Sequence, residues 1–217
     1  EDTNYFVAGH KGDITGEGID DFILIATNPN SGTKIHSFEI GEGPTFKRLH
    51  LPYTINTEIT QSQPLASQLA TIYPDKDQEI IISFGSPDRK AIILDYIGEI
   101  KQTETIGKNF LSNLAGPIIM RTTDINKDGL DDIYIMNNGE QMVETLYLSP
   151  EREPQKNTIK IDRKIKDIYF SNEKSGKLGK VFLLKDGAVF FEQWNKKIET
   201  QTKKPKKILL INKNIIS

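Results

Sequence analysis

The sequence predicts an all-β protein built from repeated antiparallel units. Short runs rich in β-branched and aromatic residues recur along its 217 residues, and no segment keeps an apolar period near 3.6. Turn-forming sequences such as Asn137-Asn138-Gly139 and Lys185-Asp186-Gly187 separate these runs. An acidic motif occurs twice, each time directly before an apolar run. These observations together predict β-hairpins that repeat along the chain.

The clearer motif runs from Asp124 to Asp132 and leads into Ile133-Tyr134-Ile135. Side-chain oxygens at positions 1, 3, 5 and 9 and a glycine at position 6 suit an oxygen-seeking cation such as calcium. The expected side-chain ligands are Asp124, Asn126, Asp128 and Asp132, with the backbone carbonyl of Leu130 at position 7. An EF-hand would need Glu at position 12 and a following helix, whereas here Ile135 lies in a strand-forming run. We therefore expect the loop to join two strands.

A second copy of the motif runs from Asp13 to Asp21. Its expected ligands are Asp13, Thr15, Glu17 and Asp21, with the backbone carbonyl of Ile19 at position 7. We expect weaker calcium binding here, because threonine offers a neutral oxygen and glutamate is long for a tight loop. For both copies the alternative is a hairpin turn that binds no metal.

Two eroded copies complete a repeat. Glu79 and Lys180 occupy the place of the final aspartate, each before an apolar run. The loop around Asp75 has Lys76 where glycine belongs, and the last loop contains Lys174 and Lys177, so we expect both to be free of metal. Four units of about fifty residues then fill the chain as one domain, at approximately 4–62, 63–112, 113–162 and 163–202.

Each unit shows the same predicted order of strands. First strands are expected at 5–8, 69–72, 117–120 and 166–170, and second strands directly after the loops. Third strands are expected at 34–40, 91–96, 144–148 and 188–194, and fourth strands at 46–51, 100–106, 156–161 and 197–201. Four-stranded units at this period predict the blades of a β-propeller. Residues 203–217 contain a further strand, at 208–211, which either closes the ring or begins the next blade of a larger propeller.

The loop from Asp124 to Asp132, followed by a strand, resembles the calcium-binding hairpin loop of FG-GAP repeats. That family is found in integrin alpha chains and in bacterial VCBS-type repeat proteins, and its loop joins the first two strands of each blade. The resemblance implies a propeller with structural Ca²⁺, bound by the ligands named above. It also implies a secreted, periplasmic or cell-surface protein.

Composition excludes several classes of function. The 28 basic and 30 acidic residues leave no broad positive surface for nucleic acid, and no apolar run is long enough for membrane insertion. The absence of cysteine excludes a disulfide framework and a thiolate metal site. Glu1 in first place is expected equally from a trimmed chain and from a processed leader.

We find no sequence pattern for catalysis. His10, His36 and His50 lie far apart, and no serine lies in a Gly-x-Ser-x-Gly elbow. The expected function is therefore non-catalytic binding of a protein or glycan, as in adhesion. The alternative is a scaffold subunit of a large secreted or envelope assembly, in which the chain pairs with another to complete a propeller. A polysaccharide lyase on a propeller fold is the third hypothesis.

Overall fold

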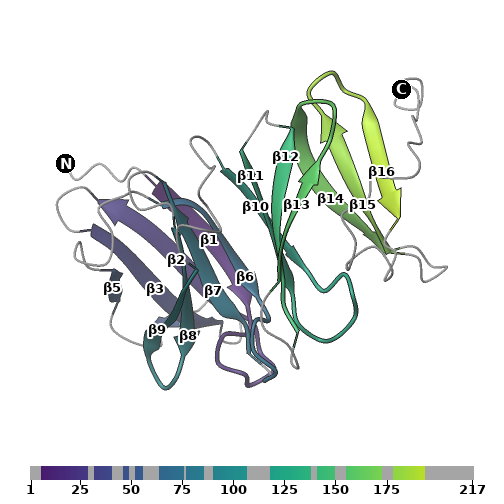
Figure 1. Cartoon of the computed structure of the whole chain (residues 1–217). Coiled ribbons are helices and arrows are strands. Elements are labelled where there is room, and N and C mark those ends of the chain that lie inside the picture. Colours follow the sequence, from purple (N-terminus) through teal and green to yellow (C-terminus); the bar gives the residue numbers. More distant parts are fainter. Residues whose placement is uncertain are drawn as a thin grey trace.

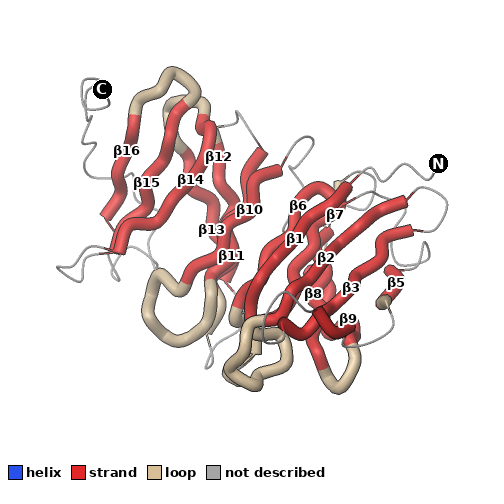
Figure 2. Tube along the Cα trace, turned by 180° about the vertical axis from the view of Figure 1, so that it is seen from behind, coloured by secondary structure: helices blue, strands red, loops and turns tan. Residues whose placement is uncertain are grey.

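A computed structural model describes residues 6–28, 32–40, 46–48, 52–55, 64–75, 77–85, 90–106, 118–137, 141–149, 155–172 and 178–193. In these ranges the regular structure is entirely β, with sixteen strands in four antiparallel sheets and no helix. The predicted all-β fold with four antiparallel units is confirmed. Figure 1 shows the sheets in a row, with the first and fourth sheets at opposite ends, and Figure 2 shows the same arrangement from behind.

Each sheet is a meander whose strands pair in chain order, except that the last strand of the first sheet pairs one strand further back. The first sheet contains β1 (Phe6–Gly12), β2 (Asp21–Asn28), β3 (Gly32–Ile40), β4 (Phe46–Arg48) and β5 (Tyr53–Ile55), with β4 and β5 both paired to β3. The second contains β6 (Pro64–Ala70), β7 (Glu79–Phe84), β8 (Lys90–Tyr96) and β9 (Ile100–Ile106). The third contains β10 (Ile118–Thr123), β11 (Asp132–Asn137), β12 (Met142–Tyr147) and β13 (Gln155–Lys160). The fourth contains β14 (Ile165–Asn172), β15 (Leu178–Leu184) and β16 (Val189–Gln193).

Several predicted strand bounds are wrong. The first strands expected to end at Ala8 and Met120 continue to Gly12 and Thr123. The first strand of the second unit was expected at 69–72, but β6 begins at Pro64 and ends at Ala70, so Thr71 and Ile72 belong to the following loop. The first sheet also contains a fifth short strand, β5, that the repeat did not predict. The strands expected at 197–201 and 208–211 lie outside the described residues.

The core consists of three apolar layers, one between each pair of neighbouring sheets. Ile80 and Ile82 of β7 pack toward the first sheet, whereas Ile81 packs toward the third. In β11, Ile133 and Ile135 pack toward the second sheet, and Tyr134 packs toward the fourth. The sequences of these two strands contain consecutive apolar residues because both faces of each strand are buried.

The end sheets are buried on one face. Along β2, buried Ile23 and Ile25 alternate with half-buried Phe22 and Leu24. The same alternation runs along β15. Contacts between the first strands of the sheets join β1 to β6, β6 to β10, and β10 to β14. Within the described ranges the four sheets therefore form an open row, and no closed ring is seen.

Candidate metal centre

Three hairpin loops of nine positions join the first and second strands of the first three sheets. We name them loop 1 (13–21), loop 2 (71–79) and loop 3 (124–132). In each, strand pairing ends at the residue in position 9, in the pairs Gly12–Asp21, Ala70–Glu79 and Thr123–Asp132. The three loops leave the same edge of the row of sheets (Figure 1).

Equivalent hydrogen bonds link each loop to the one before it. The backbone N–H of Gln78, at position 8 of loop 2, donates to the carbonyl of Asp13 at 2.8 Å. The N–H of Asp131, at position 8 of loop 3, donates to the carbonyl of Thr71 at 2.7 Å. The carboxylate of Asp131 in turn accepts from the N–H of Thr71 at 3.0 Å. The loops therefore lie side by side in one repeated arrangement.

Loops 1 and 3 share one backbone conformation. In loop 3 the carboxylate of Asp124 accepts from the N–H groups of Asp128 (3.1 Å) and Gly129 (2.9 Å), at positions 5 and 6. In loop 1 the carboxylate of Asp13 accepts from the N–H groups at the same positions, at 3.2 and 2.7 Å. In each loop, the carboxylate at position 1 therefore stabilises the turn by accepting two backbone hydrogen bonds.

Positions 4 and 6 of both loops have left-handed φ angles. They are 72° and 80° at Gly16 and Gly18, and 61° and 96° at Lys127 and Gly129. An added Cβ at Gly129 would meet no atom within 4 Å, so glycine is needed there for its conformation and not for space. The motif glycine at position 6 therefore permits the turn that points the side chains inward.

The other predicted ligands of loop 3 lie close to this turn. Asn126 accepts from the N–H of Asp128 at 3.0 Å, and its amide donates to the Asp128 carboxylate at 2.9 Å. The second Asp128 oxygen accepts from the N–H of Leu130 at 3.1 Å. Leu130 is buried, and its side chain packs in the apolar layer between the second and third sheets.

Asp132, at position 9 of loop 3, is fully buried with 0 % of its surface exposed. Its Oδ1 accepts from the N–H of Leu148 at 3.0 Å, but within the described part of the chain Oδ2 has no hydrogen-bond partner. Burial raises the pKa of this carboxyl to about 8, and the charges of Asp128 and Asp124 add to that effect, while the N–H groups of Leu148 and Ile125 oppose it. A buried carboxylate oxygen without a partner is costly, and a bound cation would satisfy it.

Loop 1 brings its end carboxylates together through Thr15. The Thr15 hydroxyl donates to Asp13 at 3.4 Å and to Asp21 at 3.3 Å, and the N–H of Ile14 donates to Asp21 at 3.1 Å. Burial raises the pKa of the Asp21 carboxyl, and the nearby charge of Asp13 raises it further. Glu17, by contrast, is exposed. Three of the four predicted side-chain ligands therefore lie in one hydrogen-bonded group.

Loop 2 contains a cluster that sequence reasoning missed. The carboxylate oxygens of Asp75, Asp77 and Glu79, at positions 5, 7 and 9, lie within 4.8 Å of one another. Glu79 is fully buried, and burial raises the pKa of its carboxyl to about 8, with the charges of Asp75 and Asp77 adding to the shift. The signal in the sequence is the alternation of three carboxylates at positions 5, 7 and 9. The sequence prediction of a metal-free loop rested instead on too few oxygens in the motif positions and on Lys76 in place of glycine.

In the fourth sheet, strand pairing extends into the segment where the repeat predicted the loop to begin. Pairing of β14 with β15 continues through Ser171–Gly179 and Asn172–Leu178, so Asn172 ends a strand. Lys180, which replaces Asp132, is buried and donates to the hydroxyl of Tyr147 at 3.1 Å. Lys174 and Lys177 lie outside the described residues.

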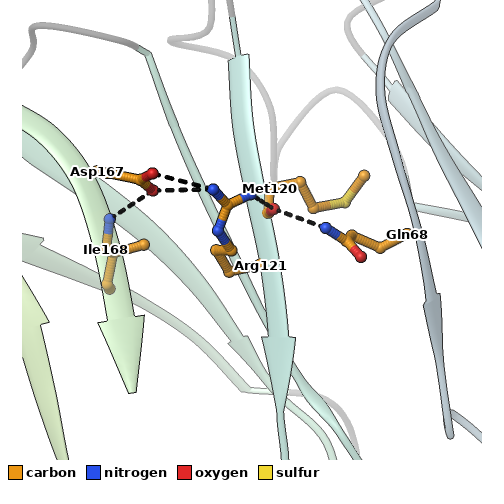
Figure 3. A network of polar contacts seen from close by, with 5 residues as sticks. All are labelled: Gln68, Met120, Arg121, Asp167 and Ile168. Carbon is orange, nitrogen blue, oxygen red and sulfur yellow. Dashed lines mark hydrogen bonds and ion pairs between the residues drawn. The ribbon is translucent and has the colours of Figure 1, made fainter. Parts of the chain in front are cut away.

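Polar side chains also link the first strands of the sheets. One guanidinium nitrogen of Arg121, in β10, donates to both carboxylate oxygens of Asp167, in β14, at 3.1 and 3.0 Å (Figure 3). Gln68 of β6 donates to the carbonyl of Met120 at 3.3 Å. Nε2 of His10 and Oγ of Ser67 lie 2.7 Å apart between β1 and β6. We interpret these contacts as polar interactions that stabilise the packing of neighbouring sheets.

A scan against protein-family models and a search of curated proteins each found no match for this chain. The likeness to FG-GAP repeats thus stays a prediction that rests on the loops. In the described part of the chain, no helix is long and apolar enough to cross a membrane.

Proposed function

We propose that this chain is a calcium-stabilised β-propeller module that binds a protein or glycan in an extracellular or envelope setting, without catalysis. The observation that carries the proposal is the shared geometry of loops 1 and 3. Two loops separated by more than a hundred residues have the same left-handed positions and the same position-1 hydrogen bonds. Both end in a buried carboxylate.

The arrangement of the sheets supports the propeller. Each is a meander, and successive first strands contact one another, as the inner strands of blades do around an axis. Metal loops at the hairpin between first and second strands match the FG-GAP pattern. Loops on such a rigid frame suit recognition of a partner.

Calcium would act on this module indirectly. The oxygens available to an ion in loops 1 and 3 come from the loops themselves, and the position-9 carboxylates are buried. Such a site leaves few open positions for a substrate, unlike a catalytic metal site. The ion would instead stabilise the hairpins that shape the neighbouring surface.

The first test is thermal unfolding in calcium and in chelator. Calcium at about a hundred times the Kd of one site adds about 2.7 kcal/mol to the free energy of unfolding. For a domain of this size, that corresponds to a rise of about 5 to 10 °C in Tm. Asp124→Asn combined with Asp13→Asn should remove most of that rise. An unchanged Tm in chelator would contradict the metal sites.

A second test addresses binding. A glycan array and a pull-down from native membranes, each with and without calcium, should detect a ligand whose binding weakens in chelator. Binding that is equally strong in chelator would contradict the indirect role of the ion.

The alternative function, a subunit that completes a propeller with another chain, is favoured by the exposed end of the row. Ile19, at position 7 of loop 1, is 53 % exposed, whereas Leu130 at the same position of loop 3 is 4 % exposed. Loops 2 and 3 use position 8 to bind the loop before them, and loop 1 has no such neighbour among the described residues. A further blade placed there would bury Ile19. Sedimentation of the wild type and of Ile19→Asp tests this: a self-complementing oligomer should dissociate in the variant, and a monomer at all concentrations would point to a different chain as partner.

A further inference from the structure

Loop 2 differs from its neighbours in the positions that offer oxygen. Thr71 and Tyr73 occupy positions 1 and 3, where loop 3 has Asp124 and Asn126. Pro74 occupies position 4, which is left-handed in loops 1 and 3, and proline cannot adopt a positive φ. Loop 2 therefore cannot copy the turn of the other two loops, and its acidic groups lie instead at positions 5, 7 and 9.

The spacing of these acidic groups fits a calcium-sized ion. Oxygens of Asp75, Asp77 and Glu79 all lie within 4.8 Å of one another. Calcium takes oxygen ligands at about 2.4 Å, so two ligands on opposite sides of the ion lie about 4.8 Å apart. The separations of the three carboxylates are therefore in the range of ligands that share one ion.

Glu79 gives a second, independent indication of a ligand. Its side chain is fully buried, and its Oε2 accepts from the N–H of Ile72 at 2.6 Å. Its Oε1 is also buried and has no hydrogen-bond partner within the described ranges. This buried oxygen is carried by a side chain that is itself a member of the cluster.

The surroundings of the cluster offer it little compensating charge. Among the residues that the structure describes, none forms an ion pair with Asp75, Asp77 or Glu79. Asp13 lies close enough for its charge to affect Asp77, and Asp77 in turn affects Asp95. A cation is the ligand that this concentration of negative charge would favour.

We propose that loop 2 binds a divalent cation of the calcium class through Asp75, Asp77 and Glu79, by a set of positions different from that of loops 1 and 3. The ion also supports the contact between loops 1 and 2. Next to Asp77, Gln78 donates to the carbonyl of Asp13, and a Cβ built on Gly16 would lie 3.6 Å from the Cβ of Asp77. An ion bound by Asp77 therefore also restrains the part of loop 2 that contacts loop 1.

The test isolates loop 2 from the other loops. In a background of Asp21→Asn with Asp132→Asn, which removes the buried carboxylates of loops 1 and 3, calorimetric titration with calcium chloride should still show one ion bound per chain. Adding Asp75→Asn or Asp77→Asn to that background should weaken the remaining binding by about tenfold or more, because each removes one of three charged ligands. Asp162→Asn, the same change at an exposed aspartate in the connection between the third and fourth sheets, is the matched control and should leave the affinity unchanged.

Two results would overturn the proposal: no calcium bound in the background chain, or an affinity that Asp75→Asn and Asp77→Asn do not alter. Calcium binding by the wild-type chain but not by the background chain would reject the loop 2 site alone and leave loops 1 and 3 intact. Should circular dichroism show that the background chain does not fold, Asp75→Asn with Asp77→Asn is made in the otherwise native chain. Native mass spectrometry should then count one calcium fewer than in the wild type, and an equal count would reject the site.

Discussion

Replacing Asp132 by asparagine should change stability in opposite ways with and without calcium. The substitution keeps the shape of the side chain and replaces an ionisable carboxyl that is fully buried at position 9 of loop 3. In chelator this carboxyl is a cost to the folded state above its usual pKa, because it must bind a proton or carry a buried charge whose Oδ2 has no partner among the described residues. In calcium the carboxylate is a ligand.

The magnitude follows from the pKa. Burial raises the pKa of Asp132 from its usual 3.8 to about 8. At pH 7.5 this difference corresponds to roughly 5 kcal/mol of lost stability by linkage, as an upper limit. The amide gives up the stronger hydrogen bond from the N–H of Leu148 and places an NH₂ group where Oδ2 lay, which costs roughly 1 to 2 kcal/mol. Asp132→Asn should therefore stabilise the protein by about 3 kcal/mol in chelator at pH 7.5.

Calcium should remove this advantage. At about a hundred times Kd, an ion in loop 3 stabilises the wild type by about 2.7 kcal/mol and leaves the variant without that gain. The two proteins should then have nearly equal free energies of unfolding. The measurement is urea denaturation followed by far-ultraviolet circular dichroism, in EDTA and in calcium, with Asp162→Asn as the control for an exposed aspartate.

Either of two results would refute this reasoning. One is a variant less stable than the wild type in EDTA at pH 7.5, which would mean that burial does not make the ionisation of Asp132 costly. The other is a calcium-dependent gain of equal size in both proteins, which would mean that Asp132 is not a ligand.

Three further predictions concern the loops and catalysis. Asp128→Ala should reduce calcium-linked stability more than Glu17→Ala, because Asp128 is hydrogen-bonded within its loop whereas Glu17 is exposed; calorimetric titration of each variant decides the order. In EDTA, the free energy of unfolding should fall as the pH rises from about 5 to about 8. The raised pKa values of Glu79 and Asp132 mean that the folded state binds more protons than the unfolded state over this range. Urea denaturation at stepped pH measures the slope, and a rise in stability would contradict it. The chain should form no unsaturated product from acidic polysaccharides, with or without calcium; product that is calcium-dependent and lost in Asp124→Ala would favour the lyase hypothesis.

The sequence by itself predicted the features that depend on local interactions. The carboxylate of Asp124 binds N–H groups four and five residues further on, and that of Asp13 does the same, so the motif contains nearly all the partners of its own turn. Antiparallel hairpins are likewise set by turns and by alternation within a few residues. This is why the third strands and the ends of loops 1 and 3 were predicted well.

Only the tertiary structure decided which eroded loops could hold an ion. Glu79 becomes a fully buried carboxylate because its sheet is packed on both faces, and Lys180 is buried against Tyr147, which lies in the preceding sheet. In the sequence alone, a glutamate and a lysine at position 9 differ only in charge. Whether the sheets close into a ring depends on the angle between neighbouring sheets, which is set by side chains that meet across three apolar layers. That angle depends on many contacts between residues far apart in the sequence, so no local pattern encodes it. The open row formed by the described strands follows from the packing of the four sheets.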